Sequence, residues 1–290
     1  MALPATRWSG QPYRQATTVR RFEAPMEWLD NQSLAEVLQS AQGDVKRAPA
    51  DPKPRIFLFQ LLCVLGSWER ALTQLQVIGE LDAASLPMVH TYRAAITAEE
   101  VRRAVFAGRI QPLILGRPER WIALALESLR LQAEAQWSQA RSLREEAFEL
   151  APANPGRLQA EHDTDFEWLA DADPRLGPIT EAVIDGKYYW VPFAHIATVT
   201  IEAPADLRDL VWTPAHFRWR NEGESFGLIP TRYPGSESHT DDRIKRSALT
   251  DWLAIGEDDF IGSGQRLFVT EADEISILDL RSVDFTLETP

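Results

Sequence analysis

The hydrophobic positions in the first half of the chain recur at the spacing of amphipathic α-helices. Beginning at Leu34, apolar residues follow at i, i+3, i+4 and i+7 after Ser33, a residue type that favours the N-cap of a helix. Thr97 to Glu100 resembles a capping box and predicts the start of another helix, which extends to Phe106. The same spacing predicts further helices over residues 56–65, 68–81, 121–133 and 138–150. We therefore expect residues 33–152 to be helical.

Part of this helical pattern repeats. Trp68 and Ala71 recur 69 residues later as Trp137 and Ala140, together with flanking leucine and glutamate positions. This offset is about twice the ~34-residue period of tetratricopeptide helix pairs. Small alanines permit close helix packing, and tryptophans fill the space between paired helices. The spacing therefore predicts a tetratricopeptide-like repeat, although its middle unit is atypical.

The hydrophobic pattern changes after residues 151–156, which hold two prolines and a glycine. Asp173 to Gly177 predicts a turn, and Pro178 to Ile184 predicts a short helix that begins with proline. Runs rich in β-branched and aromatic residues predict strands over 188–193, 195–201, 210–212, 215–220, 226–229, 267–269 and 275–278. The second half is therefore expected to be β-rich with few helices.

The two patterns predict an α+β protein with two domains. We expect a tetratricopeptide-like helical domain over residues 26–156 and a β-rich α+β domain over residues 157–290. Residues 1–25 show no consistent period, so a disordered or appended segment is expected there, and Met26 could be the natural start of the chain.

Charge and composition narrow the functional classes. The formal net charge is −13, with a balance of +2 over residues 1–159 and −15 over residues 160–290. An acidic half repels phosphate backbones, so nucleic acid is not an expected partner. The sequence has no apolar run near the ~20 residues that a membrane helix needs, and no signal peptide pattern. We expect a soluble, cytoplasmic protein.

The main candidate for chemistry is the segment around Asp171, Asp173 and Arg175. Two carboxylates and a guanidinium could form a metal site or an acid/base pair. The same residues also fit an Asx-type turn with a local ion pair, and we favour this interpretation because no histidine or further carboxylate follows at ligand spacing. Cys63 sits in an apolar helical run, where a reactive thiolate is disfavoured. No catalytic residue, cofactor site or metal site is therefore expected.

Aromatic residues are the more informative feature of the second half. Trp190, Trp212, Trp219 and Trp252 can fill a core, or some of them can anchor a partner, because tryptophan, tyrosine and arginine dominate interface hot spots. The sequence does not separate these two roles.

Several long motifs resemble one known family. They are Phe57 to Leu62, Gly66 to Leu75, Asp171 to Pro178, Tyr188 to Phe193, Asp206 to Trp212 and Ile229 to Ser236. Together they resemble the ImpE/SciE proteins, also called TagJ, which are associated with bacterial type VI secretion. The likeness runs from about Met26 to the C-terminus, and residues 1–25 depart from it.

The resemblance implies an accessory protein and not an enzyme. It implies binding to the N-terminal helical segment of the small contractile-sheath subunit, and linkage of the sheath to the AAA+ ATPase that disassembles it. It implies no cofactor and no catalytic residue. The partner-binding candidates within the motifs are Asp171, Asp173, Arg175, Tyr188, Trp190, Arg208, Trp212, Arg232 and Tyr233.

Two functional hypotheses follow. The first is a protein-binding adaptor, whose acidic β-rich half contacts the sheath helix while the helical half serves as a scaffold. The second is a metal- or small-molecule-dependent hydrolase that uses Asp171, Asp173 and Arg175, with Arg232 as a further candidate. A bound metal would favour the hydrolase, and capture of the sheath subunit would favour the adaptor.

Overall fold

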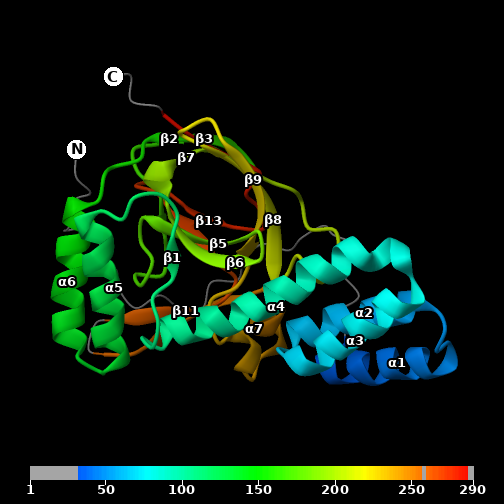
Figure 1. Cartoon of the computed structure of the whole chain (residues 1–290). Coiled ribbons are helices and arrows are strands. Elements are labelled where there is room, and N and C mark those ends of the chain that lie inside the picture. The colour runs from blue at the N-terminus through cyan, green and yellow to red at the C-terminus, as the bar shows by residue number, and fades with distance from the viewer. Residues whose placement is uncertain (1–31, 257–258, 287–290) are drawn as a thin grey trace.

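The computed structural model describes residues 32–256 and 259–286. It has a stack of helices at one end, a helical hairpin at the other and a strongly curved sheet between them (Figure 1). The predicted segment 1–25 lies outside the described residues. The helices are α1 (Leu34–Arg47), α2 (Pro52–Val64), α3 (Trp68–Leu81), α4 (Leu86–Phe106), α5 (Arg120–Ala133), α6 (Trp137–Leu150) and the short α7 (Asp242–Lys245). None of the described helices has the length and apolar composition needed to cross a bilayer.

Local sequence signals set several of the described helix ends. Ser33 and Glu36 form a reciprocal capping box at the start of α1, as Ser33 predicted. Asp51 caps α2, where Pro52 occupies the first turn, and Gly66 ends that helix region with a φ of +65°. Helix α3 has the predicted bounds.

The predicted helix start at Thr97 is wrong, because α4 already begins at Leu86. Thr97 lies inside the helix, and its hydroxyl donates to the carbonyl of Arg93, 3.0 Å away. Val89 and Tyr92 continue the buried face towards the N-terminus. Residues 97–100 therefore have the sequence of a capping box but do not form one, because the Thr97 hydroxyl bonds a backbone carbonyl of the preceding helical turn.

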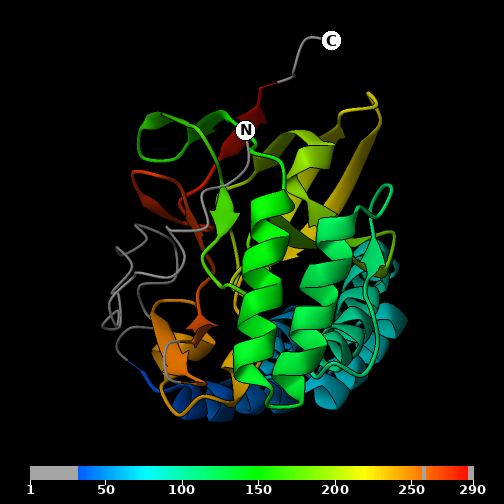
Figure 2. The same cartoon turned by 90° about the vertical axis from the view of Figure 1, so that its left-hand side faces the viewer.

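The tetratricopeptide-like repeat is not confirmed. Helices α1 to α4 pack in sequence, whereas α5 and α6 pair with each other. Figures 1 and 2 show the α5–α6 hairpin, in green, apart from the blue and cyan stack of α1 to α3. The two repeated tryptophans also have different surroundings, since Trp68 lies against Trp212 and Trp137 lies beside Gly256. The fold class, helices followed by a β-rich part, is as predicted.

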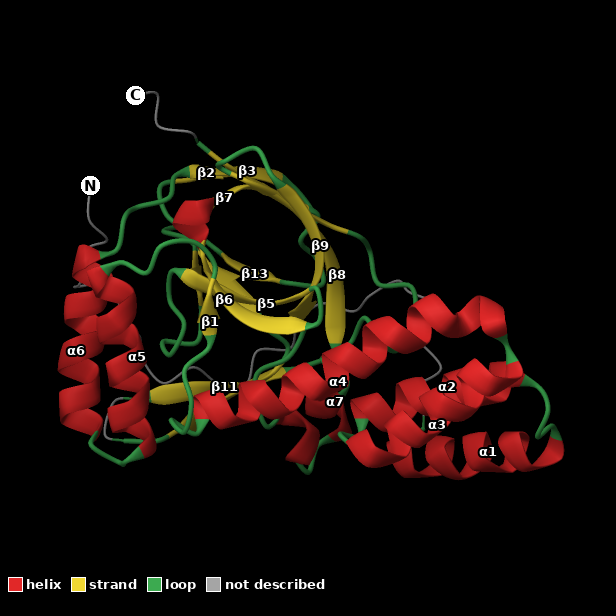
Figure 3. Ribbon diagram, in the orientation of Figure 1, coloured by secondary structure: helices red, strands yellow, loops and turns green. Residues whose placement is uncertain are grey.

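One nine-stranded sheet dominates the second half (Figure 3). Its order is β1 (Leu113–Ile114), β6 (Lys187–Pro192), β5 (Ile179–Ile184), β9 (Glu224–Pro230), β8 (Trp212–Trp219), β7 (Ile196–Ile201), β14 (Ser282–Phe285), β2 (Gly156–Gln159) and β3 (Asp163–Phe166). The β1–β6 pair is parallel and the other pairs are antiparallel. Strands β10 (Thr250–Ala254) and β11 (Phe260–Gly264) form a two-stranded sheet. A three-stranded sheet has the order β13 (Glu274–Ser276), β12 (Leu267–Val269) and β4 (Ala170–Asp171).

The short helix predicted over Pro178 to Ile184 is wrong, since Ile179–Ile184 forms strand β5. All six residues of β5 are buried, so both faces of the strand are covered and the period-2 pattern is lost. Asp185 and Gly186 both have positive φ, the geometry of a tight hairpin turn to β6. Tertiary burial therefore decided the structure of this segment.

The helical and β-rich parts share one apolar core. Strand β1 comes from the predicted helical domain and extends the sheet by pairing with β6. Phe106 of α4 contacts Trp190 of β6, and Trp68 of α3 contacts Trp212 of β8, with ring centroids 6.1 and 5.8 Å apart. The domain boundary at residue 156 stays a prediction.

Candidate functional site

The segment with Asp171 and Asp173 forms the predicted turn. Asp171 accepts from the backbone N–H of Asp173 at 2.8 Å, and Asp173 accepts from the backbone N–H and the Nε of Arg175, both at 2.9 Å. Asp173 also accepts from the backbone N–H of Gly262 at 2.9 Å. Both carboxylates are fully buried. Their oxygens thus hold the turn and the neighbouring strand β11 together.

A buried ion network connects this turn to helix α4. Glu181 of β5 accepts from Arg102 of α4 through Nε at 2.6 Å and Nη2 at 3.0 Å, and from the Tyr188 hydroxyl at 2.5 Å. Arg266 forms ion pairs with both Glu181 and Asp171. The network therefore ties α4, β5 and the turn into one unit.

Burial and charge act in opposite directions on the two carboxyls of this network. Burial alone would raise the pKa of Glu181, but Arg102 and Arg266 outweigh it and lower the pKa to about 2. Burial raises the pKa of Asp171 to about 7, although Arg266 opposes the increase. The charge of Glu181 is therefore better stabilised by its arginine partners than that of Asp171.

Arg232 connects the β-rich part to the end of helix α2. Its guanidinium donates to the backbone carbonyls of Val64 at 2.6 Å and Cys63 at 2.9 Å, and also to that of Lys245. The carbonyls of Val64 and Cys63 lie in the last turn of α2, where the regular helical donors are missing, and that of Cys63 also accepts from the N–H of Gly66. Arg232 is 2% exposed. This arginine is therefore a C-terminal cap supplied by a distant segment.

The predicted aromatic candidates are also interior residues. Trp190 donates through Nε1 to the Tyr188 hydroxyl at 2.9 Å, and Trp212 donates to Glu99 of α4, also at 2.9 Å. The Tyr233 hydroxyl donates to the carbonyl of Leu267 at 3.2 Å. Each polar atom is used inside the chain.

Eight of the nine partner-binding candidates are buried: Asp171, Asp173, Arg175, Tyr188, Trp190, Trp212, Arg232 and Tyr233. The ninth, Arg208, is half-buried, pairs with Asp206 and stacks over the Tyr92 ring at 4.8 Å. Five of the nine contact the helices α2, α3 or α4, namely Arg175, Trp190, Arg208, Trp212 and Arg232. The contacts described for the other four lie within the β-rich part. Direct contact of the nine residues with a partner stays a prediction. Within the described residues, no three His, Cys, Asp or Glu side chains are grouped to hold a metal.

A different set of residues faces solvent on the convex side of the sheet. Strands β9, β8, β7, β14, β2 and β3 bring their outward side chains into two rows, which we call the outer sheet face. The first row is Phe226, His216, Thr200, Ser282, Gln159 and Asp163, and the second is Glu224, Arg218, Thr198, Asp284, Arg157 and Asp165.

The outer sheet face combines one exposed aromatic ring with ordered polar contacts. Phe226 is 78% exposed and stacks on His216 with centroids 4.4 Å apart. In the second row, Arg218 donates to Thr198 at 2.9 Å and Thr198 donates to Asp284 at 2.8 Å. Sequence reasoning predicted the strands that form β7, β8 and β9 but not β14, β2 or β3. Phe226 was not predicted as a site, because the pattern within one strand does not show which neighbours cover it.

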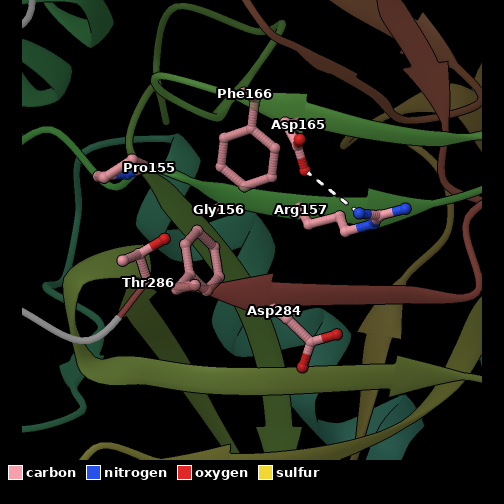
Figure 4. Close-up of a pocket in the computed structure, with 8 residues that line it drawn as sticks. Pro155, Gly156, Arg157, Asp165, Phe166, Asp284 and Thr286 are labelled. Carbon is pink, nitrogen blue, oxygen red and sulfur yellow. Dashed lines mark ion pairs between the residues drawn. The ribbon is translucent and has the colours of Figure 1, made fainter.

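A shallow pocket of about 470 Å³ lies at the β3 end of this face (Figure 4). The rings of Phe166 and Phe285 line it, and Arg157 pairs with Asp165 at its side. An apolar floor with a charged rim can accept a side chain from a partner. The pocket extends the outer sheet face as a surface for contact.

Comparison with known proteins decides the family. A family model described as ImpE protein matches residues 163–284. A Pseudomonas aeruginosa protein named type VI secretion system accessory component TagJ is 48% identical over 252 residues, which cover 87% of this chain and 87% of that protein.

The chain belongs to the ImpE family. The resemblance indicated by the motifs is therefore confirmed. A crystal structure of a Vibrio parahaemolyticus protein matches with a TM-score of 0.79 and 27% identity, over 90% of this chain and 96% of that one. The arrangement of helices and curved sheet described above is thus similar to an experimental structure.

Proposed function

We propose that this ImpE-family chain is a non-catalytic accessory protein of a type VI secretion system. It binds the N-terminal helical segment of the small contractile-sheath subunit and links the sheath to its AAA+ disassembly ATPase. The observation that carries the proposal is the 48% identity, over 87% of both chains, to a protein named as an accessory component of that system.

The chemistry of the buried carboxylates supports a role without turnover. Asp171 and Asp173 are fully buried, and their oxygens accept from arginines and backbone N–H groups. A general base or metal ligand needs a lone pair that substrate or metal can reach. The interactions of these carboxylates favour a structural role over the hydrolase hypothesis.

The outer sheet face is the surface we assign to the sheath helix. An antiparallel sheet with one uncovered face accepts a helix as a second layer. Phe226 supplies an exposed aromatic anchor of the kind that dominates hot spots. The face carries four carboxylates, Asp163, Asp165, Glu224 and Asp284, against two arginines. Arg157 pairs with both Asp163 and Asp165, so the negative charge that remains can attract basic residues on the helix. This assignment follows the prediction that the acidic half makes the contact.

Substitution at Phe226 tests the assignment. Because Phe226 is 78% exposed, Phe226→Ala leaves the fold intact, and we expect it to weaken binding of the small sheath subunit by about tenfold or more. Leu253→Ala is the matched control, since Leu253 is 41% exposed on strand β10, outside the outer sheet face. Binding is measured by calorimetry with the full chain.

The outcomes are distinguishable. If Phe226→Ala binds as tightly as the unmodified chain, the assigned surface is wrong although the function stands. If the unmodified chain does not bind the small sheath subunit at all, the proposed function is wrong.

A further inference from the structure

The free edge of strand β1 combines apolar, basic and backbone features that the proposed sheath contact does not use. We call Arg109, Ile110, Leu113, Arg117 and Lys187 the β1 edge patch. The first four lie on or beside β1, and Lys187 belongs to the paired strand β6, two residues before Tyr189, the register partner of Leu113. Ile110 is 47% exposed and Leu113 is 50% exposed, so both can pack against an added segment. Figure 1 shows β1 on the side of the sheet nearest α5, away from β8 and β9.

The backbone of β1 has one unpaired side within the described chain. Strand β1 is the terminal strand of the nine-stranded sheet, and its only partner there is β6. The N–H of Leu115 donates to the carbonyl of Trp190 at 3.0 Å. Because hydrogen-bonding direction alternates along a strand, the N–H and C=O of Ile114 point to the opposite, free side. An added strand would find a donor and an acceptor there.

The patch is basic within an acidic protein. Arg109, Arg117 and Lys187 are exposed, and no ion pair within the described residues involves any of the three. Two exposed carboxylates lie close in sequence, Glu119 and Asp185, and Glu119 is 3.9 Å from His195. Arg120 is already paired with Glu146 at 2.6 Å, so the three basic residues leave a surplus of one positive charge here. The chain as a whole carries −13. A complementary ligand is therefore negatively charged.

We propose that the β1 edge patch binds an extended, acidic segment of a partner protein as an additional β-strand. Backbone hydrogen bonds to Ile114 fix the strand, aliphatic side chains of the segment pack on Ile110 and Leu113, and its carboxylates pair with the three basic residues. This is the β-augmentation mode of peptide recognition. The patch is separate from the outer sheet face, so the proposal does not depend on sheath binding.

A second copy of this chain is a weaker fit to the patch. Two β1 edge patches carry the same charge and repel each other. The β1–β6 ladder is two residues long, so an added strand gains few backbone hydrogen bonds and its affinity depends on the side-chain contacts and on charge.

The test uses the full chain and a blocked synthetic peptide of alternating glutamate and valine. We expect saturable binding by fluorescence anisotropy, weakened several-fold by added salt. Leu113→Asp, and separately the pair Arg109→Glu and Arg117→Glu, should weaken binding by about tenfold. Leu150→Asp, at an equally exposed leucine at the end of α6, should leave binding unchanged.

Two further measurements separate strand addition from simple charge attraction. Peptide binding should slow hydrogen exchange of the Ile114 amide, and N-methylation of alternate peptide amides should abolish binding. A lysine–valine peptide should not bind. The proposal is overturned if the acidic peptide does not bind, if N-methylation has no effect, or if Ile114 exchange is unchanged. It is also overturned if sedimentation shows self-association of the chain that Leu113→Asp abolishes, since a second copy then occupies the patch.

Discussion

Removing the charge of Glu181 tests the role assigned to the buried motif residues. Glu181→Gln keeps the size of the side chain but removes the anion that pairs with Arg102 and Arg266. Both guanidiniums are buried, at 3% and 0% exposure, so neither gains water in exchange. Each keeps one other carboxylate, Glu99 for Arg102 and Asp171 for Arg266. We expect a large loss of stability without a change of fold.

Two arguments give the size and the sign of this loss. Breaking a buried ion pair by removing one partner costs about 3–5 kcal/mol. The same two arginines lower the pKa of Glu181 from the usual 4.5 to about 2, which has the same sign, since the folded state favours the ionised carboxyl. We expect Glu181→Gln to cost about 3–4 kcal/mol at neutral pH.

Urea denaturation followed by far-UV circular dichroism measures this effect. With a slope of about 2–3 kcal/mol per molar urea, the midpoint should fall by about 1–2 M. Glu224→Gln is the control, because Glu224 lies on the exposed outer sheet face and should change stability by less than about 0.5 kcal/mol.

The pH dependence of stability tests the direction of the effect of Glu181. The folded-state pKa of Glu181 is lowered, so its stabilisation is present above about pH 4.5 and is lost as the pH falls towards 2. The difference between the unmodified chain and Glu181→Gln should therefore shrink over that range. A midpoint shift no larger than that of Glu224→Gln, or a difference that is constant from pH 7 to 2, would refute the reasoning.

Three further predictions concern other parts of the fold. Gly177→Ala should lower the free energy of unfolding by about 2–4 kcal/mol, because φ is +55° and a Cβ would overlap the Phe148 ring. Gly235→Ala is the control, since φ is +87° but the space around it is open, and it should cost only about 1–2 kcal/mol in thermal or urea unfolding. Burial raises the pKa of Asp171 to about 7, so between about pH 4 and 7 the folded state keeps a proton that the unfolded state has lost. The free energy of unfolding of the unmodified chain should therefore fall as the pH rises through this range, and Asp171→Asn should remove that fall. Urea titrations of both proteins at several pH values check this. Ser33→Ala should lower stability by about 1 kcal/mol through loss of the capping box, and an unchanged midpoint would contradict that role.

Local periodicity predicted most helices because their signals lie within a few residues. The cap at Ser33 and both bounds of α3 (Trp68–Leu81) depend on neighbouring side chains and were correct. Strand β5 (Ile179–Ile184) was missed because its burial on both faces comes from distant elements. The error at Thr97 has a local cause, because a threonine hydroxyl can bond the carbonyl one turn earlier inside a helix as well as cap a helix start.

The long-range partners of the motif residues were beyond local reasoning for a related cause. The turn at Asp171 and its local Asp173–Arg175 pair were predicted and are present. The other partners are distant, since Arg266 lies 95 residues from Asp171 and Arg102 lies 79 residues from Glu181. Arg232 caps a helix that ends 168 residues earlier. No short-range pattern indicates these pairs. Phe226 was likewise not singled out, since only the register across six strands places it on an uncovered face.

Calorimetric titration of the full chain with the small sheath subunit measures the proposed contact itself. We expect saturable binding to the intact subunit and loss of that binding when its N-terminal helical segment is deleted. Equal binding to both forms of the subunit, or no binding to either, would contradict the proposed contact.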